Sequence, residues 1–121
     1  MPPDSRKHLF DIREAAARIG RFASGRSLEN YLADDFLRSA VERQFEIIGE
    51  AMGRLLRIDR VTAERISEYP RIVSFRNQLI HGYDVIDDAI VWRIVEQKLP
   101  VLVAEVDAML AEGAPSPAAP D

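Results

Sequence analysis

Arg76 and His81 lie five positions apart and Tyr83 follows two residues later, so three reactive side chains fall within eight residues. Arginine offers phosphoryl oxygens a planar, permanently charged set of donors. Histidine takes and gives protons near neutral pH, and this chain contains only two. These residue types at this spacing predict acid–base chemistry on a phosphate group.

The spacing of Arg76 and His81 does not place them on one face of a helix. Five residues at about 100° each put the two side chains roughly 140° apart around the axis. Two arrangements remain open: the helix end bends His81 round toward Arg76, or the two residues meet across an interface between two chains. A structural role is a third interpretation, in which His81 caps the helix and Arg76 pairs with Asp84 or Glu68.

The demands of RNA cleavage favour the arrangement with two chains. Cleavage without a metal needs a base that takes the 2′-hydroxyl proton and an acid that protonates the leaving 5′-oxygen. One chain offers one suitable histidine in this segment, whereas a two-fold dimer offers two, with two arginines for the charge of the transition state. The sequence therefore favours a homodimer with this segment at its axis.

The composition is that of one soluble domain. The chain has 121 residues, of which 47% are hydrophobic and 30% charged, which suits a single core. It has no cysteine, no long apolar run and no apolar stretch behind its first residues. These features predict a cytoplasmic protein without a signal peptide, a thiolate metal site or a membrane-spanning segment.

The net charge of −4 argues against a broad electrostatic grip on nucleic acid. Arginine nevertheless outnumbers lysine 14 to 2. Six arginines lie between positions 54 and 76, namely Arg54, Arg57, Arg60, Arg65, Arg71 and Arg76. They are interpreted either as a solvated helix face or as a small stripe that contacts RNA.

Apolar residues recur at three- and four-residue steps through almost the whole chain, which predicts helices rather than strands. We expect helices over residues 5–23, 28–33, 36–57, 70–81 and 88–110, and a short helical turn over residues 62–67. The expected fold class is all-α: an up-and-down bundle of four to five helices over residues 1–112. The proline-rich residues 113–121 should form a disordered tail.

Punctuating residues mark the expected helix ends. N-terminal caps are expected at Asp4 or Ser5, Ser27, Asp34 or Asp35, and Asp87. Pro70 suits a helix start, Gly82 a helix end, and Pro100 should interrupt the last helix. Asp84, Asp87 and Asp88 also suggest a divalent cation, but they lack Glu-x-x-His partners, so capping is the preferred interpretation.

Two features of the predicted helix interiors bear on packing. The long helix should bury Leu37, Val41, Phe45 or Ile48, Met52 and Leu55, with Phe36, Ala40, Ile47 and Ala51 beside them. Gly49 and Gly53 lie inside this helix, where each costs about 0.5–1 kcal/mol relative to alanine. Such glycines indicate that another backbone comes close, either within the chain or across a subunit interface. Trp92, the only tryptophan, should lie in the core or an interface.

The segment Arg76-Asn77-Gln78-Leu79-Ile80-His81-Gly82-Tyr83 resembles the Arg-x4-His-x-Tyr motif of the HepT-like branch of the HEPN superfamily. The runs at residues 40–51 and 90–95, the second followed by Leu99-Pro100, are similar to that branch as well. The likeness covers about residues 5–110. One departure is that Arg71 and Ile72 follow Pro70, where the family often has tryptophan.

The resemblance implies a HEPN-like helical bundle that acts as a homodimeric, metal-independent endoribonuclease without a cofactor, often as the toxin of a two-gene toxin–antitoxin module. Arg76 and His81 would be the catalytic pair, and Asn77 would orient the substrate or the histidine. Tyr83 matches the tyrosine that a cognate minimal nucleotidyltransferase antitoxin modifies with AMP. The substrate would be RNA, with tRNA as one candidate.

A second hypothesis has the same nucleotidyltransferase partner but no catalytic activity. The chain would be a helical module that binds a nucleotidyltransferase or its nucleotide, with Arg76 holding a phosphate and no RNA being cut. The full set of Arg76, His81 and Tyr83 favours the ribonuclease, because pure binding does not require His81.

Overall fold

The computed structural model describes residues 1–112, except for the side chain of Tyr83. The predicted tail at residues 113–121 lies outside the described residues. Residues 1–112 form seven α-helices and one 3₁₀ helix and contain no strand, which confirms the all-α prediction. The elements are α1 (Pro3–Ala23), α2 (Leu28–Ala33), α3 (Asp35–Ile58), α4 (Arg60–Ala63), α5 (Tyr69–His81), η1 (Tyr83–Val85), α6 (Asp88–Gln97) and α7 (Leu99–Ala111).

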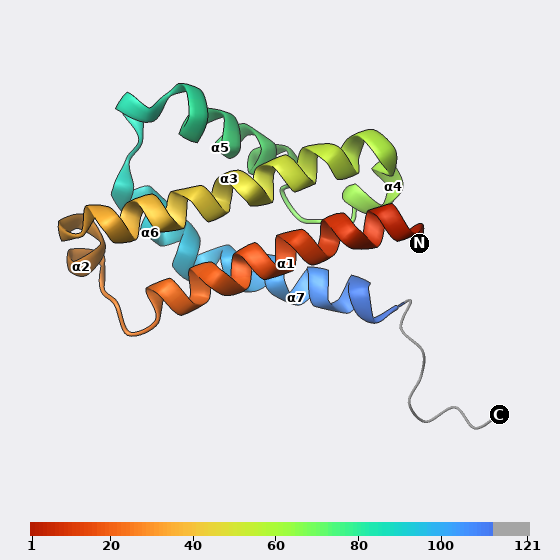
Figure 1. The fold of residues 1–121 in the computed structure, drawn as a ribbon, viewed down its shortest axis with the longest axis horizontal. Coiled ribbons are helices and arrows are strands. Elements are labelled where there is room, and N and C mark those ends of the chain that lie inside the picture. The colour runs from red at the N-terminus through yellow and green to blue at the C-terminus, as the bar shows by residue number, and fades with distance from the viewer. Residues whose placement is uncertain (113–121) are drawn as a thin grey trace.

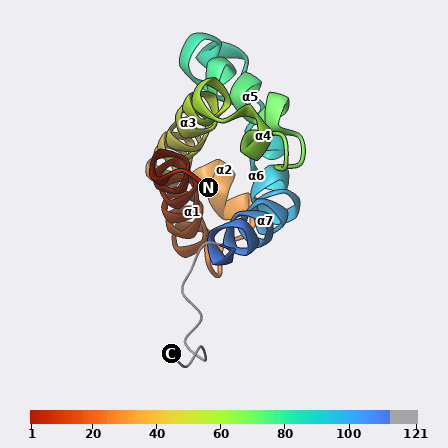
Figure 2. The same cartoon turned by 90° about the vertical axis from the view of Figure 1, so that its right-hand side faces the viewer.

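The two longest helices, α1 and α3, run antiparallel and pack against each other along most of their length (Figure 1). α7 packs along α1, and α5 packs along the opposite side of α3, as the end-on view in Figure 2 also shows. α2 and α6 close the end of the bundle at which α3 begins. Among the α-helices, α5 has extensive contacts with α3 alone, so it lies at the edge of the bundle.

The core follows the predicted periodicity. The predicted buried face of α3 is confirmed, since Leu37, Val41, Phe45, Ile48, Met52 and Leu55 are all buried. The prediction that Phe36 lies beside this buried face is wrong, because its side chain is 83% exposed. The reason is that Asp34 caps α3 two residues before it, which leaves Phe36 in the exposed first turn of the helix.

α1 begins earlier than the sequence predicts, and neither Asp4 nor Ser5 caps it. The helix starts at Pro3, a residue suited to a first turn because it has no N–H to satisfy. Ser5 is fully buried and its hydroxyl donates to the carboxylate of Asp59 at 2.7 Å. Asp59 also accepts from the backbone N–H of Thr62 at 3.2 Å and from its hydroxyl at 2.6 Å. This carboxylate therefore caps α4 and ties the start of α1 to the end of α3.

The remaining capping predictions are confirmed. Ser27 and Asn30 form a reciprocal capping box at the start of α2. Asp87 accepts from the backbone N–H groups of Ala89 and Ile90 at 3.0 and 3.3 Å. The predicted last helix is interrupted at Lys98, between α6 and α7, and Pro100 stands in the first turn of α7.

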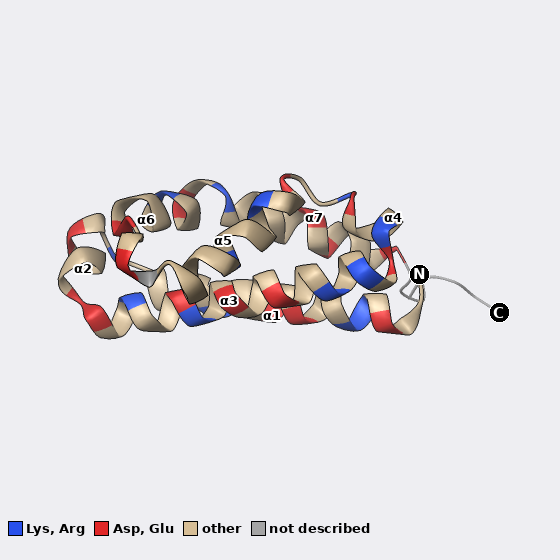
Figure 3. Ribbon diagram, turned by 90° about the horizontal axis from the view of Figure 1, so that it is seen from above, with Lys and Arg blue, Asp and Glu red and all other residues tan. Residues whose placement is uncertain are grey.

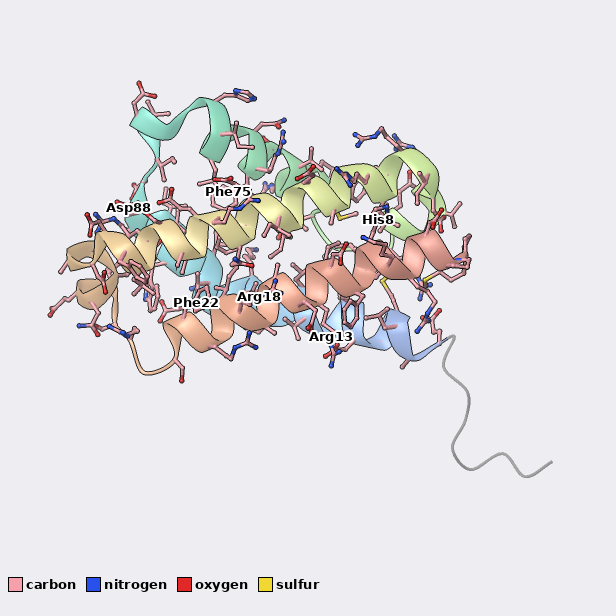
Figure 4. All side chains as sticks on the ribbon, in the orientation of Figure 1. His8, Arg13, Arg18, Phe22, Phe75 and Asp88 are labelled. Atoms are coloured by element: carbon pink, nitrogen blue, oxygen red, sulfur yellow. The ribbon has the colours of Figure 1, made fainter. Side chains whose placement is uncertain are left out.

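A buried aromatic pair joins α2 to α6. Trp92 is buried, as predicted, and its ring centroid lies 5.1 Å from that of the fully buried Tyr31. Burial raises the pKa of the Tyr31 hydroxyl first, and the charges of Glu42 and Asp88 raise it further. Arg38 pairs with Asp88 at 3.6 Å, so the first turns of α3 are tied to the start of α6, where Figure 4 labels Asp88.

Candidate active site

α5 carries the predicted catalytic residues and is a regular helix from Tyr69 to His81. Pro70 stands in its first turn, as predicted. Leu79 is buried against the core, and the rings of Phe75 and Phe45 meet edge to face at 5.2 Å, with Phe75 directed toward α3 (Figure 4). The helix ends where the sequence predicts, because Gly82 is the C-terminal cap and its N–H donates to the carbonyl of Gln78 at 2.8 Å.

Arg76 is half-buried between α5 and α3. Its Cβ and Cγ lie against the backbone of Gly49, where a side chain on α3 would otherwise stand. The Nε atom is buried and meets no acceptor among the described side chains. Nη1 donates to the side-chain oxygen of Asn77 at 3.2 Å. The arginine stem is therefore held by packing, and its outer end by one hydrogen bond.

The alternative carboxylate partners of Arg76 are not used in the described part of the chain. Glu68 instead accepts from Arg71 and Lys98, each at 3.1 Å, and these bonds lower its pKa, the one from Lys98 most. No ion pair joins Arg76 to Asp84 within residues 1–112. The guanidinium group thus keeps donors available for an anion.

His81 is exposed and is the last residue of α5. Because the helix stays regular through His81, its end does not bend the imidazole round toward Arg76. Helix geometry leaves the two side chains about 140° apart around the axis. One chain therefore positions both residues on the same helix without bringing them together.

Tyr83 lies two residues beyond His81, at the start of η1. Its backbone follows the helix cap Gly82 directly, so the AMP acceptor predicted from the motif and the predicted acid–base residue share one helix end. Asn77 is exposed on α5, one turn before His81. The four predicted site residues thus occupy the last turns of α5 and the start of η1.

A cavity formed by the described residues does not contain the predicted pair. It has a volume of about 470 Å³ and lies between α3, α5, α6 and α7, lined mainly by apolar side chains that include Phe45, Ile72, Phe75 and Ile94. A second hollow of about 110 Å³, between α1 and α3, includes His8 and Arg54. Neither of these two cavities is lined by Arg76, Asn77 or His81.

The predicted arginine stripe is mostly neutralised by neighbouring carboxylates. Arg54 pairs with Glu50 at 2.9 Å, Arg60 with Glu64 at 3.3 Å and Arg71 with Glu68, and Arg65 pairs with Glu112. Figure 3 shows basic and acidic residues interspersed along α1 and α3. Of the six arginines, Arg57 and Arg76 form no ion pair within residues 1–112. This favours the interpretation as a solvated helix face over an RNA-binding stripe.

The aspartates near the motif serve the fold. Asp87 caps α6 and Asp88 pairs with Arg38. Among the described side chains, no group of three or more histidines and carboxylates is arranged to hold a metal ion. Within the same residues, no helix has the length and apolar content needed to cross a membrane.

One residue that sequence reasoning did not assign to the site emerges from the packing. Gly49 was recognised as a close-approach glycine, and the structure shows that the approach is within the chain and that the neighbour is Arg76.

The sequence pattern of the ribonuclease HepT-like family matches residues 12–109. The chain belongs to this family. The match spans the helices from α1 to α7 and includes all four residues of the predicted site. The HepT-like resemblance inferred from the motif is therefore confirmed.

Relatives of this HepT-like chain carry ribonuclease names. A Methanocaldococcus jannaschii protein provisionally named an RNase is 34% identical over 106 residues, covering 86% of this chain and 94% of its own. A second provisionally named RNase from that organism is 31% identical, covering 90% of this chain and 89% of its own. A Thermococcus cleftensis protein named a probable ribonuclease HepT is 30% identical, covering 84% and 92%. No solved structure matches the chain.

Membership of the HepT-like family supports a ribonuclease role for this chain. The relatives match over most of their own lengths as well as over most of this chain, so the comparison concerns whole helical domains rather than a short motif.

Proposed function

We propose that this HepT-like protein is a metal-independent endoribonuclease that acts as a homodimer, with Arg76 and His81 from both subunits around one phosphodiester. The observation that carries the proposal is the placement of the two residues on one regular helix at the edge of the bundle, on different sides of its axis. A single subunit presents one general acid–base group, and RNA cleavage by internal attack requires two. A second subunit supplies the missing group.

Exposed apolar side chains beside the catalytic histidine support an interface at this place. Ile80 is 36% exposed and Val85 is 77% exposed, and they flank His81 on α5 and η1. Apolar side chains that surround a polar reactive group are expected where a partner surface covers them. The edge position of α5 leaves this helix end accessible to a second copy.

The reaction follows from the roles of the residues. His81 of one subunit takes the proton of the 2′-hydroxyl, whose oxygen attacks the adjacent phosphorus. The 5′-oxygen leaves and takes a proton from the partner subunit's His81, so the products are a 2′,3′-cyclic phosphate and a 5′-hydroxyl. Arg76 stabilises the charge that grows on the phosphoryl oxygens, and Asn77 holds the guanidinium group through its side-chain oxygen.

We place this ribonuclease in a type VII-like toxin–antitoxin module, in which a cognate minimal nucleotidyltransferase transfers AMP to Tyr83. The support is chemical: an adenylate on Tyr83 would add negative charge and bulk two residues from His81, where an RNA phosphate must bind. The proposed RNA substrates include tRNA. The protein would act in the cytoplasm and would have no membrane partner.

The dimeric site is tested by placing a charge in the proposed interface. Val85→Glu should dissociate the dimer, measured by light scattering, and should remove RNA cleavage with it. Val61→Glu is the matched control, because Val61 is 78% exposed on α4, outside the proposed interface, and it should leave both unchanged. A wild-type monomer that cleaves RNA, or a Val85→Glu dimer with full activity, would contradict the dimeric site.

The non-catalytic module remains the second candidate. A wild-type chain that binds a nucleotidyltransferase, shows no toxicity when expressed alone and cuts no RNA would establish it in place of the ribonuclease.

A further inference from the structure

We infer that Gly49 of α3 is a positioning residue for Arg76, an inference that rests on the catalytic role proposed for Arg76. Gly49 is buried where α3 and α5 cross. A Cβ atom added to it would lie far inside van der Waals contact with the Cβ of Arg76, and 2.8 Å from its Cγ. It would also lie 3.2 Å from the backbone carbonyl oxygen of Ile72. The missing side chain of Gly49 is thus the space that the arginine stem occupies.

The clash involves atoms that cannot simply rotate away. Cβ moves with the helix backbone, and the carbonyl of Ile72 belongs to the backbone of α5 itself. Carbon atoms pack at about 3.5–4.0 Å, so a side chain at position 49 requires α5 to shift by on the order of 1 Å at Arg76. A shift of that size is enough to misplace a catalytic group.

Burial of the arginine stem explains why its position matters. The Nε atom of Arg76 is inaccessible to solvent and has no acceptor among the described side chains. Only the far end of the guanidinium group reaches a partner, Asn77. The stem therefore leaves α5 packed directly against the backbone of α3 at Gly49.

Gly53, one turn later on the same helix, provides the contrast. A Cβ atom on Gly53 would meet only the Nη1 atom of Arg57, at 3.8 Å, which is an ordinary contact with the end of a flexible side chain. The two glycines have the same chemistry and the same helix, but only Gly49 faces Arg76. Gly53→Ala is therefore the matched control for Gly49→Ala.

The first measurement observes the arginine directly and does not depend on activity. In the ¹⁵N-labelled wild-type protein, the side-chain Nε–H of Arg76, assigned by its absence in Arg76→Lys, should be protected from exchange with solvent. Gly49→Ala should move this signal or remove its protection, and Gly53→Ala should leave it unchanged. A fast-exchanging Arg76 Nε–H in the wild type would overturn the inference even if Gly49→Ala does not fold.

The second measurement is single-turnover cleavage of RNA by the wild type, Gly49→Ala and Gly53→Ala. Gly49→Ala should lower the rate on the order of 10²-fold, and Gly53→Ala should keep the wild-type rate. In the Arg76→Ala background, Gly49→Ala should lower the rate no further, whereas general damage to the fold would lower it again. Gly49→Ala with wild-type cleavage and an unmoved Nε–H signal would overturn the inference. A wild type that cuts no RNA would refute the proposed function, and the signal would still decide the placement of Arg76.

Discussion

Replacing Arg76 by lysine tests what the guanidinium group contributes beyond its charge. Lysine keeps one positive charge and a long aliphatic stem, so it fills the same space against Gly49. It lacks the buried Nε–H, and its ammonium group cannot offer two parallel donors to a phosphoryl group. Lysine also lacks the Nη1 atom, which in Arg76 donates a hydrogen bond to the side-chain oxygen of Asn77 at 3.2 Å.

The size of the effect follows from the bonds lost. The forked contact of arginine with the phosphoryl oxygens is reduced to a single contact from lysine, so one charge-assisted hydrogen bond disappears. Such a bond is worth about 1.5–3 kcal/mol. Since about 1.4 kcal/mol corresponds to a factor of ten in rate, Arg76→Lys should slow cleavage roughly 10- to 150-fold. Stability should change little, because the packed stem is retained.

The assay is single-turnover cleavage of a fluorescently labelled RNA, with the dimer and its thermal unfolding measured in parallel. Arg71→Lys is the matched control on the same helix, where the arginine is exposed and pairs with Glu68. It should cleave at the wild-type rate. Full activity of Arg76→Lys would refute the role of the guanidinium fork, since charge alone would then suffice.

Two further predictions concern the fold and the modification. Asp59→Ala should lower the free energy of unfolding by about 2 kcal/mol, because the cap of α4 and the partner of the buried Ser5 are lost. Hydrogen bonds from Thr62, and next from Ser5, hold the pKa of Asp59 below its ordinary 3.8. Denaturation experiments should therefore show the full difference in free energy of unfolding between the wild type and Asp59→Ala above about pH 4, and a smaller difference as the pH falls below about 4. Co-expression with the cognate nucleotidyltransferase should add AMP mass to the wild type and none to Tyr83→Phe; AMP retained on Tyr83→Phe would reject Tyr83 as the acceptor.

Local sequence signals predicted most of the fold because the deciding interactions are local. The caps at Ser27, Asp34 and Asp87 depend on contacts within three residues, and the end of α5 at Gly82 depends on one turn of helix. The start of α1 was not predicted, since Ser5 bonds Asp59, which lies 54 positions away. Long-range partners of this kind leave no periodic signal in the chain.

The candidate site was predictable in its residues but not in its packing. The motif names Arg76 and His81, and the spacing already shows that they lie on different sides of a helix. The sequence left open whether Gly49 meets another helix of the same chain or another subunit. The structure decides this, because Gly49 lies against Arg76. Which helices cross at a glycine depends on tertiary packing, which a single sequence does not encode in any local pattern.

His81 is the residue proposed to carry the acid–base chemistry of RNA cleavage. The direct measurement is the cleavage of RNA by purified wild-type and His81→Ala dimers in excess EDTA, with the end groups of the products identified. Loss of general acid–base catalysis should slow the variant by on the order of 10² to 10⁴. The wild type should stay active in chelator and yield 2′,3′-cyclic phosphate and 5′-hydroxyl ends. A His81→Ala dimer that cleaves at the wild-type rate would contradict the proposed role of His81, and a wild type that stops in EDTA would contradict cleavage without a metal.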